Sequence, residues 1–266
     1  MCYIGNMKIG IFDSGLGGLL IAKAIRKTMP LYDYVYLGDT KNLPYGNKSQ
    51  MQIYKNTIQA LEYLFKQDCI LVIVACNTAS SQALRRVQQE WLPRSKFKNR
   101  KVLGVIRPTA ESVGKLKNIG LIGTLRTTDS GAYVQELEKI NPKIKLFAKA
   151  TPKLVPMTES GKYNEKILSN YLMPFKKADS LILACTHYGL LKKQIQNILG
   201  SKVKIIAQED LIPRKLKSYL MKHKEITKNL SHSHKFELLL TKLSVRYQKL
   251  AGKWFGPDTK IRLINL

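Results

Sequence analysis

Acidic residues are scarce in this chain: its 266 residues include 18 Asp and Glu against 45 Lys and Arg, a formal net charge of +27. Such a charge attracts anions and polyanions, but it does not define a fold. The last 66 residues carry 15 of the basic and 5 of the acidic residues, so the excess is not a discrete basic tail. The charge keeps nucleic acid as a candidate partner, although no recognised nucleic-acid-binding motif occurs.

Long apolar runs are also missing. No run approaches the roughly 18 residues that a membrane span needs, and Lys8 precedes any long apolar segment, so no signal-peptide pattern opens the chain. We therefore expect a cytoplasmic protein with no membrane partner. With 44% apolar residues, the chain is long enough for two modest domains with proper cores.

Cysteine is rare and shows no Cys-x-x-Cys spacing: the four residues are Cys2, Cys69, Cys76 and Cys185. This spacing argues against both a disulfide framework and a zinc site. The alternating histidines of residues 231–234 are weak evidence for metal and are more typical of a solvated linker. We expect no metal.

Residues 71–81 read Leu-Val-Ile-Val-Ala-Cys-Asn-Thr-Ala-Ser-Ser, an apolar run that ends in a cysteine followed by small polar residues. The run predicts a buried parallel strand that leads into a helix, with residues 77–80 supplying the cap. Cys76 would then lie at the carboxyl end of the strand and face a helix N-terminus, where the helix dipole lowers the pKa of a thiol. A small buried apolar residue is the alternative interpretation of a single cysteine.

The same pattern occurs a second time. Residues 180–188, Ser-Leu-Ile-Leu-Ala-Cys-Thr-His-Tyr, place Cys185 after a strand, 109 positions beyond Cys76. Residues 9–14 and 119–124 form a further matching pair at an offset of 110. Two matches at nearly the same offset indicate two similar halves.

Strand and helix patterns alternate along the chain and predict α/β layers with mainly parallel sheets. Residues 151–161, which include Glu159, are expected to form a loop. We expect helices at 19–28, 52–66 and 81–91, the last ending at Pro93, and lysine-rich helices after 207. The expected strands are 8–12, 34–37, 71–75, 102–106, 118–123, 143–147, 180–184, 202–207 and, at the edge of a sheet, 260–264.

Two equivalent cysteines at strand ends in duplicated halves are expected to face each other across a cleft. A carbon acid held between them could lose a proton to one sulfur and gain one from the other, which inverts a stereocentre. One cysteine must start as thiolate and the other as thiol, and local dipoles and charges can tune a thiol to either role. Neighbouring polar groups could clamp a carboxylate and an ammonium, or could simply cap helices. These groups belong to Ser14, Asn77, Thr78, Thr124 and Thr186.

Other cysteine chemistries fit the sequence less well. A phosphatase-like Cys-x5-Arg loop needs arginine six positions on, where the chain has Gln82 and Leu191. A cysteine hydrolase needs one nucleophile with one histidine base. His187 follows Cys185 in a polar cap, so we favour a role as acid or base over the alternative that it only begins a helix.

An ordered set of short motifs spans residues 8–190. The motifs are Asp13-Ser14-Gly15 with Gly17-Gly18, Gly38-Asp39-Thr40 with Pro44-Tyr45-Gly46, Cys76-Asn77-Thr78-Ala79-Ser80, Gly123-Thr124 with Thr127, Ser130 and Tyr133, Glu159 after Val155-Pro156, and Cys185-Thr186-His187-Tyr188. In these motifs the chain resembles the glutamate racemases of the cofactor-independent aspartate/glutamate racemase superfamily. The resemblance implies two pseudo-symmetric, Rossmann-like three-layer α/β domains with the active site in the cleft between them. Residues 7–104 with 209–266 would form the first domain, and 105–208 the second.

The roles known in that family carry over by position. The resemblance implies that Cys76 and Cys185 are the acid/base thiols and that Asp13 and His187 assist proton transfer, with Glu159 as a further candidate. It also implies a glutamate site formed by Asp13, Ser14, Pro44, Tyr45, Gly46, Asn77, Thr78, Thr124, Thr186 and His187. The implied reaction interconverts L- and D-glutamate without a cofactor and supplies D-glutamate for peptidoglycan, hence for cell shape. The family pattern allows a homodimer.

Two positions depart from the family pattern. Gly189 stands where the family usually has Pro, and Arg107 stands before Pro108 where it usually has an acidic residue. The departures leave the thiols intact but change loop rigidity and local charge. A racemase of aspartate or a related amino acid is the near alternative, and a basic nucleic-acid-binding protein on the same scaffold is the alternative from another class.

Overall fold

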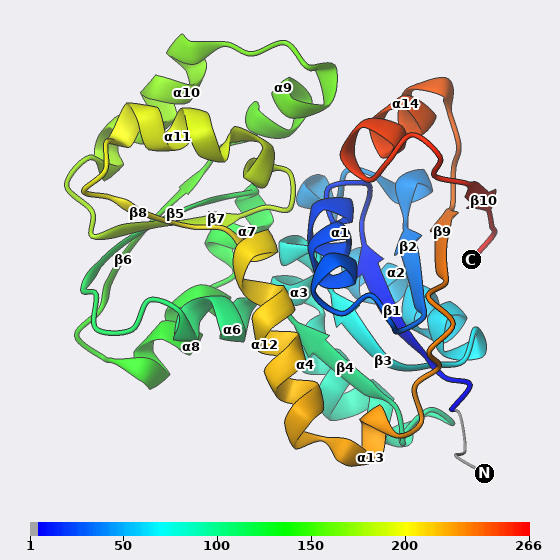
Figure 1. Cartoon of the computed structure of the whole chain (residues 1–266). Coiled ribbons are helices and arrows are strands. Elements are labelled where there is room, and N and C mark those ends of the chain that lie inside the picture. Colours follow the sequence, from blue (N-terminus) through cyan, green and yellow to red (C-terminus); the bar gives the residue numbers. More distant parts are fainter. Residues whose placement is uncertain (1–4) are drawn as a thin grey trace.

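Strands and helices alternate along the first half of the chain in the computed structural model, which describes residues 5–266 (Figure 1). The strands are β1 (Lys8–Asp13), β2 (Tyr34–Gly38), β3 (Cys69–Val74) and β4 (Lys101–Gly104). The helices are α1 (Leu19–Thr28), α2 (Gln50–Lys66), α3 (Asn77–Gln82), α4 (Leu84–Arg86), α5 (Leu92–Arg94) and α6 (Ile106–Glu111). Shorter turns are η1 (Thr40–Asn42) and η2 (Tyr45–Asn47), both 3-10, and the π turn η3 (Val87–Trp91).

The second half repeats this alternation and then returns to the first. Its strands are β5 (Asn118–Gly123), β6 (Lys145–Ala150), β7 (Ser180–Ala184) and β8 (Lys204–Ile206). Its helices and turns are α7 (Leu125–Asp129), α8 (Ala132–Ile140), α9 (Leu154–Ser160), α10 (Glu165–Leu172), η4 (Met173–Phe175), η5 (Tyr188–Leu191) and α11 (Lys192–Leu199). The returning segment contains α12 (Gln208–Lys222), α13 (Lys224–Thr227), β9 (Phe236–Leu240), α14 (Val245–Trp254) and β10 (Ile261–Leu263).

The two sheets share one strand order. The six-stranded sheet has the order β10-β9-β2-β1-β3-β4, and the four-stranded sheet has β6-β5-β7-β8. Both therefore contain the second, first, third and fourth strands of their own half in that order. Every strand pair within residues 5–266 is parallel. The predicted α/β class, the parallel sheets and the duplication are confirmed.

Successive side chains of the central strands pack into different apolar layers, because side chains alternate between the faces of a strand. Ile11 of β1 belongs to the cluster that includes α1 and α12, whereas Phe12 belongs to the cluster that includes α2. Helices on both faces make each sheet the middle of three layers (Figure 1). The cluster around α12 also contains Leu121 and Ile182 of the second sheet, so one apolar core is continuous between the sheets.

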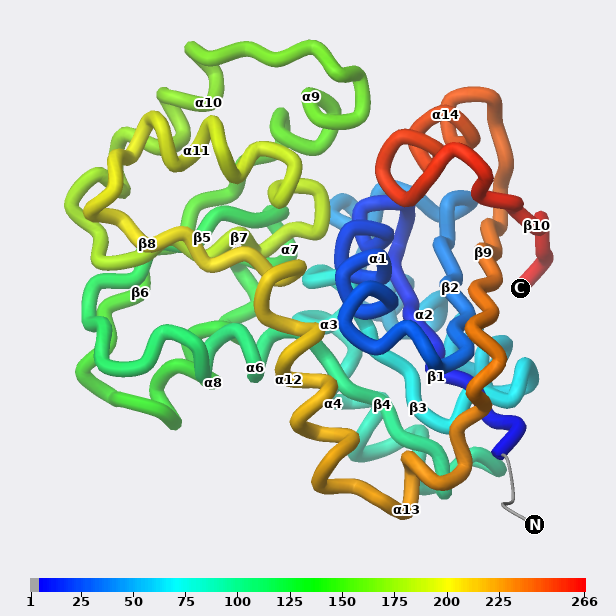
Figure 2. The backbone as a smooth tube through the Cα atoms, in the orientation of Figure 1, coloured from blue at the N-terminus to red at the C-terminus, as the bar shows by residue number. Residues whose placement is uncertain are grey.

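Two segments of the chain connect the sheets (Figure 2). The first runs from β4 through α6 to β5, and the second runs from β8 into α12. After α12 the chain adds β9 beside β2 and β10 at the edge of the first sheet. We infer from this path the division implied by the resemblance, with residues 7–104 and 209–266 in one domain and 105–208 in the other.

Some sequence predictions are wrong at particular elements. Residues 151–161 are not a loop, because α9 occupies much of the segment and buries Leu154 and Met157. Its Pro156 stands in the first helical turn, where the missing N–H costs little. Strand β9 lies within the segment predicted to hold lysine-rich helices.

Other boundaries shift by a few residues. The strand predicted at 102–106 ends at Gly104, since Ile106 already begins α6. The helix predicted at 81–91 begins at Asn77 and continues, with breaks, through Pro93 to Arg94. The linker 231–234 is exposed except for Ser231, whose hydroxyl is buried and donates a hydrogen bond to Asp33 Oδ2 at 2.6 Å. The predicted edge strand at 260–264 is present as β10.

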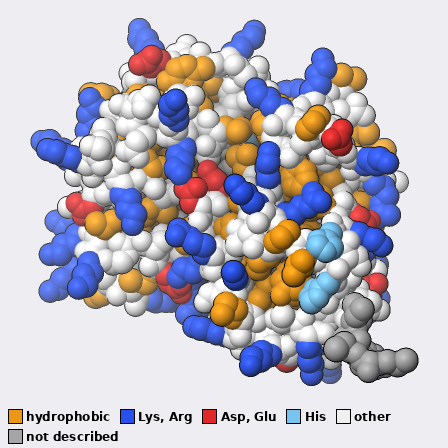
Figure 3. Space-filling view, viewed as in Figure 1, with side chains coloured by type: hydrophobic (Ala, Val, Ile, Leu, Met, Phe, Trp, Pro, Cys, Tyr) orange, Lys and Arg blue, Asp and Glu red, His pale blue; other side chains and the backbone are white. Residues whose placement is uncertain are grey.

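Basic side chains spread over the whole visible face of the molecule and do not gather on one element (Figure 3). Within residues 5–266, no helix combines the length and apolarity that crossing a membrane requires. Cys2 lies outside the described residues, and the other three cysteines are free thiols.

Candidate active site

Cys76 follows β3 at the point where the strand order of the first sheet reverses around β1. In open parallel sheets, the crevice outside the strand ends at such a point is the usual ligand site. The thiol is 5% exposed; Cys76 Sγ donates to Ser14 Oγ at 3.2 Å and accepts from the Ala79 N–H at 3.4 Å. Cys76 is thus itself the N-cap of α3, which corrects the prediction that residues 77–80 supply the cap.

The predicted lowering of the Cys76 pKa is also wrong for this state of the protein. Burial and, to a smaller extent, the nearby Asp13 carboxyl raise the pKa of Cys76 to about 12. The hydrogen bonds of Cys76 with Ser14 and with the Ala79 N–H act in the opposite direction but do not outweigh desolvation. The first cysteine is therefore a thiol at neutral pH in this structure.

Cys185 occupies the equivalent place after β7, at the reversal of the second sheet. Its Sγ lies 3.9 Å from His187 Nδ1, and His187 Nε2 lies 3.1 Å from Glu159 Oε1. The other carboxylate oxygen of Glu159 accepts from Arg246 Nη2 of α14 at 2.8 Å. The ring of Trp254, also in α14, meets the His187 ring edge to face at 5.5 Å between centroids. Two elements from opposite halves thus hold the histidine.

The charges in this cluster reinforce one another. Burial alone would lower the pKa of His187, but the hydrogen bonds with Cys185 and Glu159 and their charges raise it to about 10. The pKa of Glu159 falls despite its burial, because His187 and Arg246 stabilise the carboxylate. His187 is therefore an imidazolium at neutral pH, placed beside Cys185.

Asp13, the last residue of β1, joins the turn that follows the strand to the loop that carries Cys185. Its Oδ2 accepts from the N–H groups of Gly15 and Gly18, and its Oδ1 accepts from Thr186 Oγ1 at 3.5 Å. Burial raises the pKa of Asp13, and the His187 charge and these hydrogen bonds oppose the rise.

The same turn passes so close to the Cys185 loop that a side chain at Gly17 would displace Thr186 or His187. A Cβ there would lie 2.3 Å from Thr186 Oγ1 and 2.6 Å from His187 Nδ1. Ser14, at the other side of the turn, touches Cys76. Residues 13–18 therefore contact the surroundings of both cysteines.

Three threonine hydroxyls continue the site from the first half into the second. Thr78 Oγ1 lies 2.9 Å from Thr124 Oγ1, which lies 3.0 Å from Thr127 Oγ1. Gly46 packs against Thr124, where an added Cβ would come within 3.2 Å of the threonine Cβ.

The loop after β2 brings Pro44, Tyr45 and Gly46 to this region. Pro44 is exposed, whereas Tyr45 is buried and its hydroxyl donates to Asp39 Oδ2 at 2.7 Å. Asp39 also accepts from Thr241 Oγ1 at 2.8 Å, so the loop is anchored to the end of β9.

Asn77 lies beside Cys76, but its side-chain amide is turned toward two other elements, α8 and α12. It forms hydrogen bonds with Gln208 and Tyr133, both buried. No sequence pattern points to Gln208, Arg246 or Trp254, because none of them has a fixed spacing from the cysteines. Within residues 5–266, no three His, Cys, Asp or Glu side chains are arranged to hold a metal ion.

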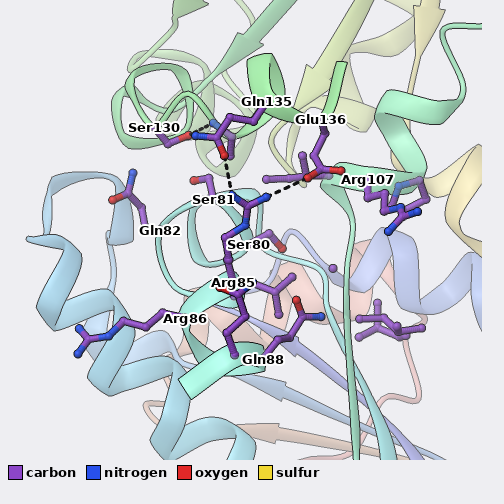
Figure 4. Close-up of a pocket in the computed structure, with 18 of the residues that line it drawn as sticks. Ser80, Ser81, Gln82, Arg85, Arg86, Gln88, Arg107, Ser130, Gln135 and Glu136 are labelled. Carbon is purple, nitrogen blue, oxygen red and sulfur yellow. Dashed lines mark hydrogen bonds and ion pairs between the residues drawn. The ribbon is translucent and has the colours of Figure 1, made fainter. Parts of the chain in front are cut away.

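A groove of about 860 Å³ lies away from the thiols, at the far end of α3 (Figure 4). Ser80 and Gln82 of α3 and Arg107 of α6 line it. Arg85 reaches across the groove to α8, where it donates to Gln135 at 2.9 Å and pairs with Glu136 at 3.4 Å. Arg107, which stands where the family usually has an acidic residue, therefore changes the charge of this groove and not that of the site around the cysteines.

The departure at Gly189 has a local counterpart in the chain. A Cβ at this position would lie 2.2 Å from Glu209 Oε1, so the glycine makes room for that carboxylate. Burial and the neighbouring Asp210 raise the pKa of Glu209.

Two parallel α/β sheets of one strand order, each with a cysteine at its reversal point and a shared turn between them, are the arrangement of an amino-acid racemase. No family model matches the chain. A glutamate racemase from Aquifex pyrophilus is 39% identical over 265 residues, 97% of each chain. The chain belongs to the glutamate racemase family.

Solved structures agree with this assignment. A glutamate racemase from Bacillus anthracis superposes with a TM-score of 0.87 at 29% identity, covering 98% of both chains. A glutamate racemase from Francisella tularensis, solved in complex with D-glutamate, superposes with a TM-score of 0.86 at 31% identity over 98% of both chains.

Proposed function

We propose that this protein interconverts L- and D-glutamate, with Cys76 and Cys185 as the two acid/base groups. The observation that carries the proposal is the shared turn 13–18: its Ser14 contacts Cys76 on one side, and its Asp13 and Gly17 lie against Thr186 and His187 on the other. Family membership supports glutamate as the substrate.

The proposed reaction needs one thiolate and one thiol. The thiolate removes the proton from Cα, and the electron pair left on carbon is delocalised into the adjacent carboxylate. The opposite thiol then delivers its proton to the other face of the same carbon, so the configuration inverts and the two sulfurs exchange protonation states. Solvent or the reverse reaction restores the starting state.

Charged groups beside the sulfurs assist these transfers. The His187 imidazolium can offset negative charge that develops on Cys185 Sγ, 3.9 Å away. Asp13 is held between the two cysteine loops by Gly15, Gly18 and Thr186, where it can balance the ammonium group of the substrate. We infer that substrate binding relieves the high Cys76 pKa, because an ammonium group beside a buried thiol favours the thiolate.

The proposed substrate contacts are those implied by the family resemblance. They are made by Asp13, Ser14, Pro44, Tyr45, Gly46, Asn77, Thr78, Thr124, Thr186 and His187. The Thr78 and Thr124 hydroxyls, 2.9 Å apart, are suited to bind one carboxylate together. The Tyr45 hydroxyl already donates its hydrogen bond to Asp39. The contribution of Tyr45 is therefore to hold the loop that carries Pro44 and Gly46 in place.

The test is solvent exchange at Cα. Purified protein with L-glutamate in D2O should lose optical rotation and incorporate deuterium at Cα, and Cys76→Ala or Cys185→Ala should abolish turnover. Cys69→Ala is the matched control, because Cys69 is fully buried at the start of β3 and should be dispensable. Absence of exchange with either enantiomer of glutamate would refute the proposal, and a higher kcat/KM for aspartate would correct the substrate.

The cellular setting belongs to the same proposal. The D-glutamate formed would serve peptidoglycan synthesis in the cytoplasm, and the enzyme would work as a homodimer, which sedimentation analysis can test. The charge of +27 favours a second candidate, nucleic-acid binding on the same scaffold. Binding that persists with a steep salt slope at physiological ionic strength would support that candidate, and binding that vanishes there would exclude it.

A further inference from the structure

Gln208 is the first residue of α12 and lies in a buried network of four polar side chains. It is 2% exposed, and its partners Asn77, Tyr133 and Thr109 are 2%, 2% and 0% exposed. Asn77 Nδ2 donates to Gln208 Oε1 at 2.7 Å, and Gln208 Nε2 donates to Asn77 Oδ1 at 2.9 Å. The two amides therefore form a paired, two-bond contact.

The hydroxyl groups of the network fix which way both amides point. Tyr133 donates to Asn77 Oδ1 at 2.8 Å, while Gln208 Nε2 lies 3.2 Å from Tyr133 Oη and 3.3 Å from Thr109 Oγ1. The Thr109 hydroxyl donates its own hydrogen bond to the carbonyl oxygen of Val105, at 2.6 Å. Turning either amide over would bring two donors or two acceptors together, so the network has one consistent arrangement.

The network also lies where the two halves of the molecule are joined. Thr109 belongs to α6, on the segment from β4 to β5, and Gln208 begins α12, on the segment from β8 back to the first sheet. Tyr133 comes from α8 of the second half. Asn77 is the first residue of α3, directly after the Cys76 cap.

We propose that Gln208 is a positioning residue for the racemase reaction: it holds the Asn77 amide and, through the first turn of α3, the position of Cys76 Sγ. The inference rests on the proposed function. The link is the Ala79 N–H, which the first turn of α3 aims at the sulfur at 3.4 Å. Substitution of Gln208 should therefore impair proton transfer at Cys76 more than at Cys185.

Three variants test the network in different ways. Gln208→Met keeps the length of the side chain without its hydrogen bonds, and Gln208→Glu replaces the donor that faces Asn77 Oδ1 with an acceptor. Tyr133→Phe removes a single hydroxyl and is the mildest change. The control is Ser231→Ala, which removes a buried hydroxyl bonded to Asp33 near the amino-terminal ends of β1 and β2.

The measurement is racemisation with α-deuterated L- and D-glutamate, so that the primary isotope effect is obtained for each direction. Gln208→Met should lower kcat/KM about tenfold or more, and Gln208→Glu further, because small displacements of a reacting group are costly. The isotope effect should rise for the enantiomer that Cys76 deprotonates, which Cys76→Ser identifies in the same assay. Ser231→Ala should change the melting temperature but neither isotope effect.

The outcomes separate this inference from the function itself. An active wild type whose folded Gln208→Met variant keeps kcat/KM within twofold, or raises both isotope effects equally, would overturn the positioning role alone. If the Gln208 variants do not fold, Tyr133→Phe must show the same one-sided isotope effect, and a symmetric result overturns the inference. An inactive wild type would overturn the racemase proposal and this inference together.

Discussion

Replacing Glu159 with Gln removes the charge beside His187 and keeps the size of the side chain. In the wild type the two side chains are only 14% and 7% exposed, and their closest atoms are 3.1 Å apart. The pKa of His187 is raised from 6.5 to about 10, which corresponds to a preference for the imidazolium on the order of 5 kcal/mol. A single opposite charge at this distance accounts for a rise of roughly 1 to 3 in pKa.

In E159Q the pKa of His187 should therefore be lower than in the wild type by roughly 1 to 3. The folded pKa of His187 lies above its unfolded value, so its charge stabilises the fold fully below pH 6.5 and ceases to do so as the pH rises through about 10. At pH 7 we expect E159Q to be less stable than the wild type by roughly 1 to 4 kcal/mol. The difference should shrink above pH 10.

Two assays check this prediction. Urea unfolding between pH 7 and pH 11 gives the stability difference, and kcat/KM over the same range gives the basic limb of activity, which should move to lower pH in E159Q. Arg246→Ala is the control, because its side chain is 56% exposed and pairs with the same carboxylate, so its loss should cost less than about 1 kcal/mol. An unmoved limb together with a stability difference that is the same at pH 7 and pH 11 would refute the charge argument.

Three further substitutions give distinct expected results. Gly17→Ala forces the turn away from Thr186 and His187, so kcat/KM should fall about a hundredfold while the circular dichroism stays unchanged. The control is Gly252→Ala, whose added Cβ would lie at an ordinary contact distance from Pro257, and it should match the wild type. Tyr45→Phe removes a donor from the fully buried Asp39 and should cost roughly 1 to 3 kcal/mol in urea unfolding. Arg85→Ala breaks an exposed contact across the groove and should lower stability by less than about 1 kcal/mol, with a difference that disappears in high salt.

The sequence predicted those parts of the fold that depend on local pattern. Helix α1 and strand β5 have the bounds expected from their apolar periodicity and from the turn residues next to them. Helix α9 was not predicted because prolines at 152 and 156 resemble chain breakers, although Pro156 is harmless in a first turn. Strand β9 is five residues long, and only its pairing with β2 distinguishes it from the lysine-rich segments around it.

For the candidate site, the sequence indicated the two cysteines because the duplication repeats a strand, a thiol and a polar cap. The contacts of Glu159 with Arg246 and of Asn77 with Gln208 join residues 87 and 131 positions apart, and no local pattern encodes such pairs. The pKa of Cys76 was predicted in the wrong direction, because the helix terminus is visible in the sequence but the extent of burial is not.

The continuous apolar core around α12 makes the junction of the two sheets stiff on that side. On the side of α9 and α14, which face each other at the top of Figure 1, the Glu159 carboxylate is bridged to an arginine that water reaches freely. The two sheets are thus held firmly together around α12 and only weakly between α9 and α14. Small acids would reach the cysteines between α9 and α14. Higher ionic strength weakens an exposed ion pair such as that of Glu159 with Arg246. It would then change the rates of substrate binding and product release without changing proton transfer at the cysteines.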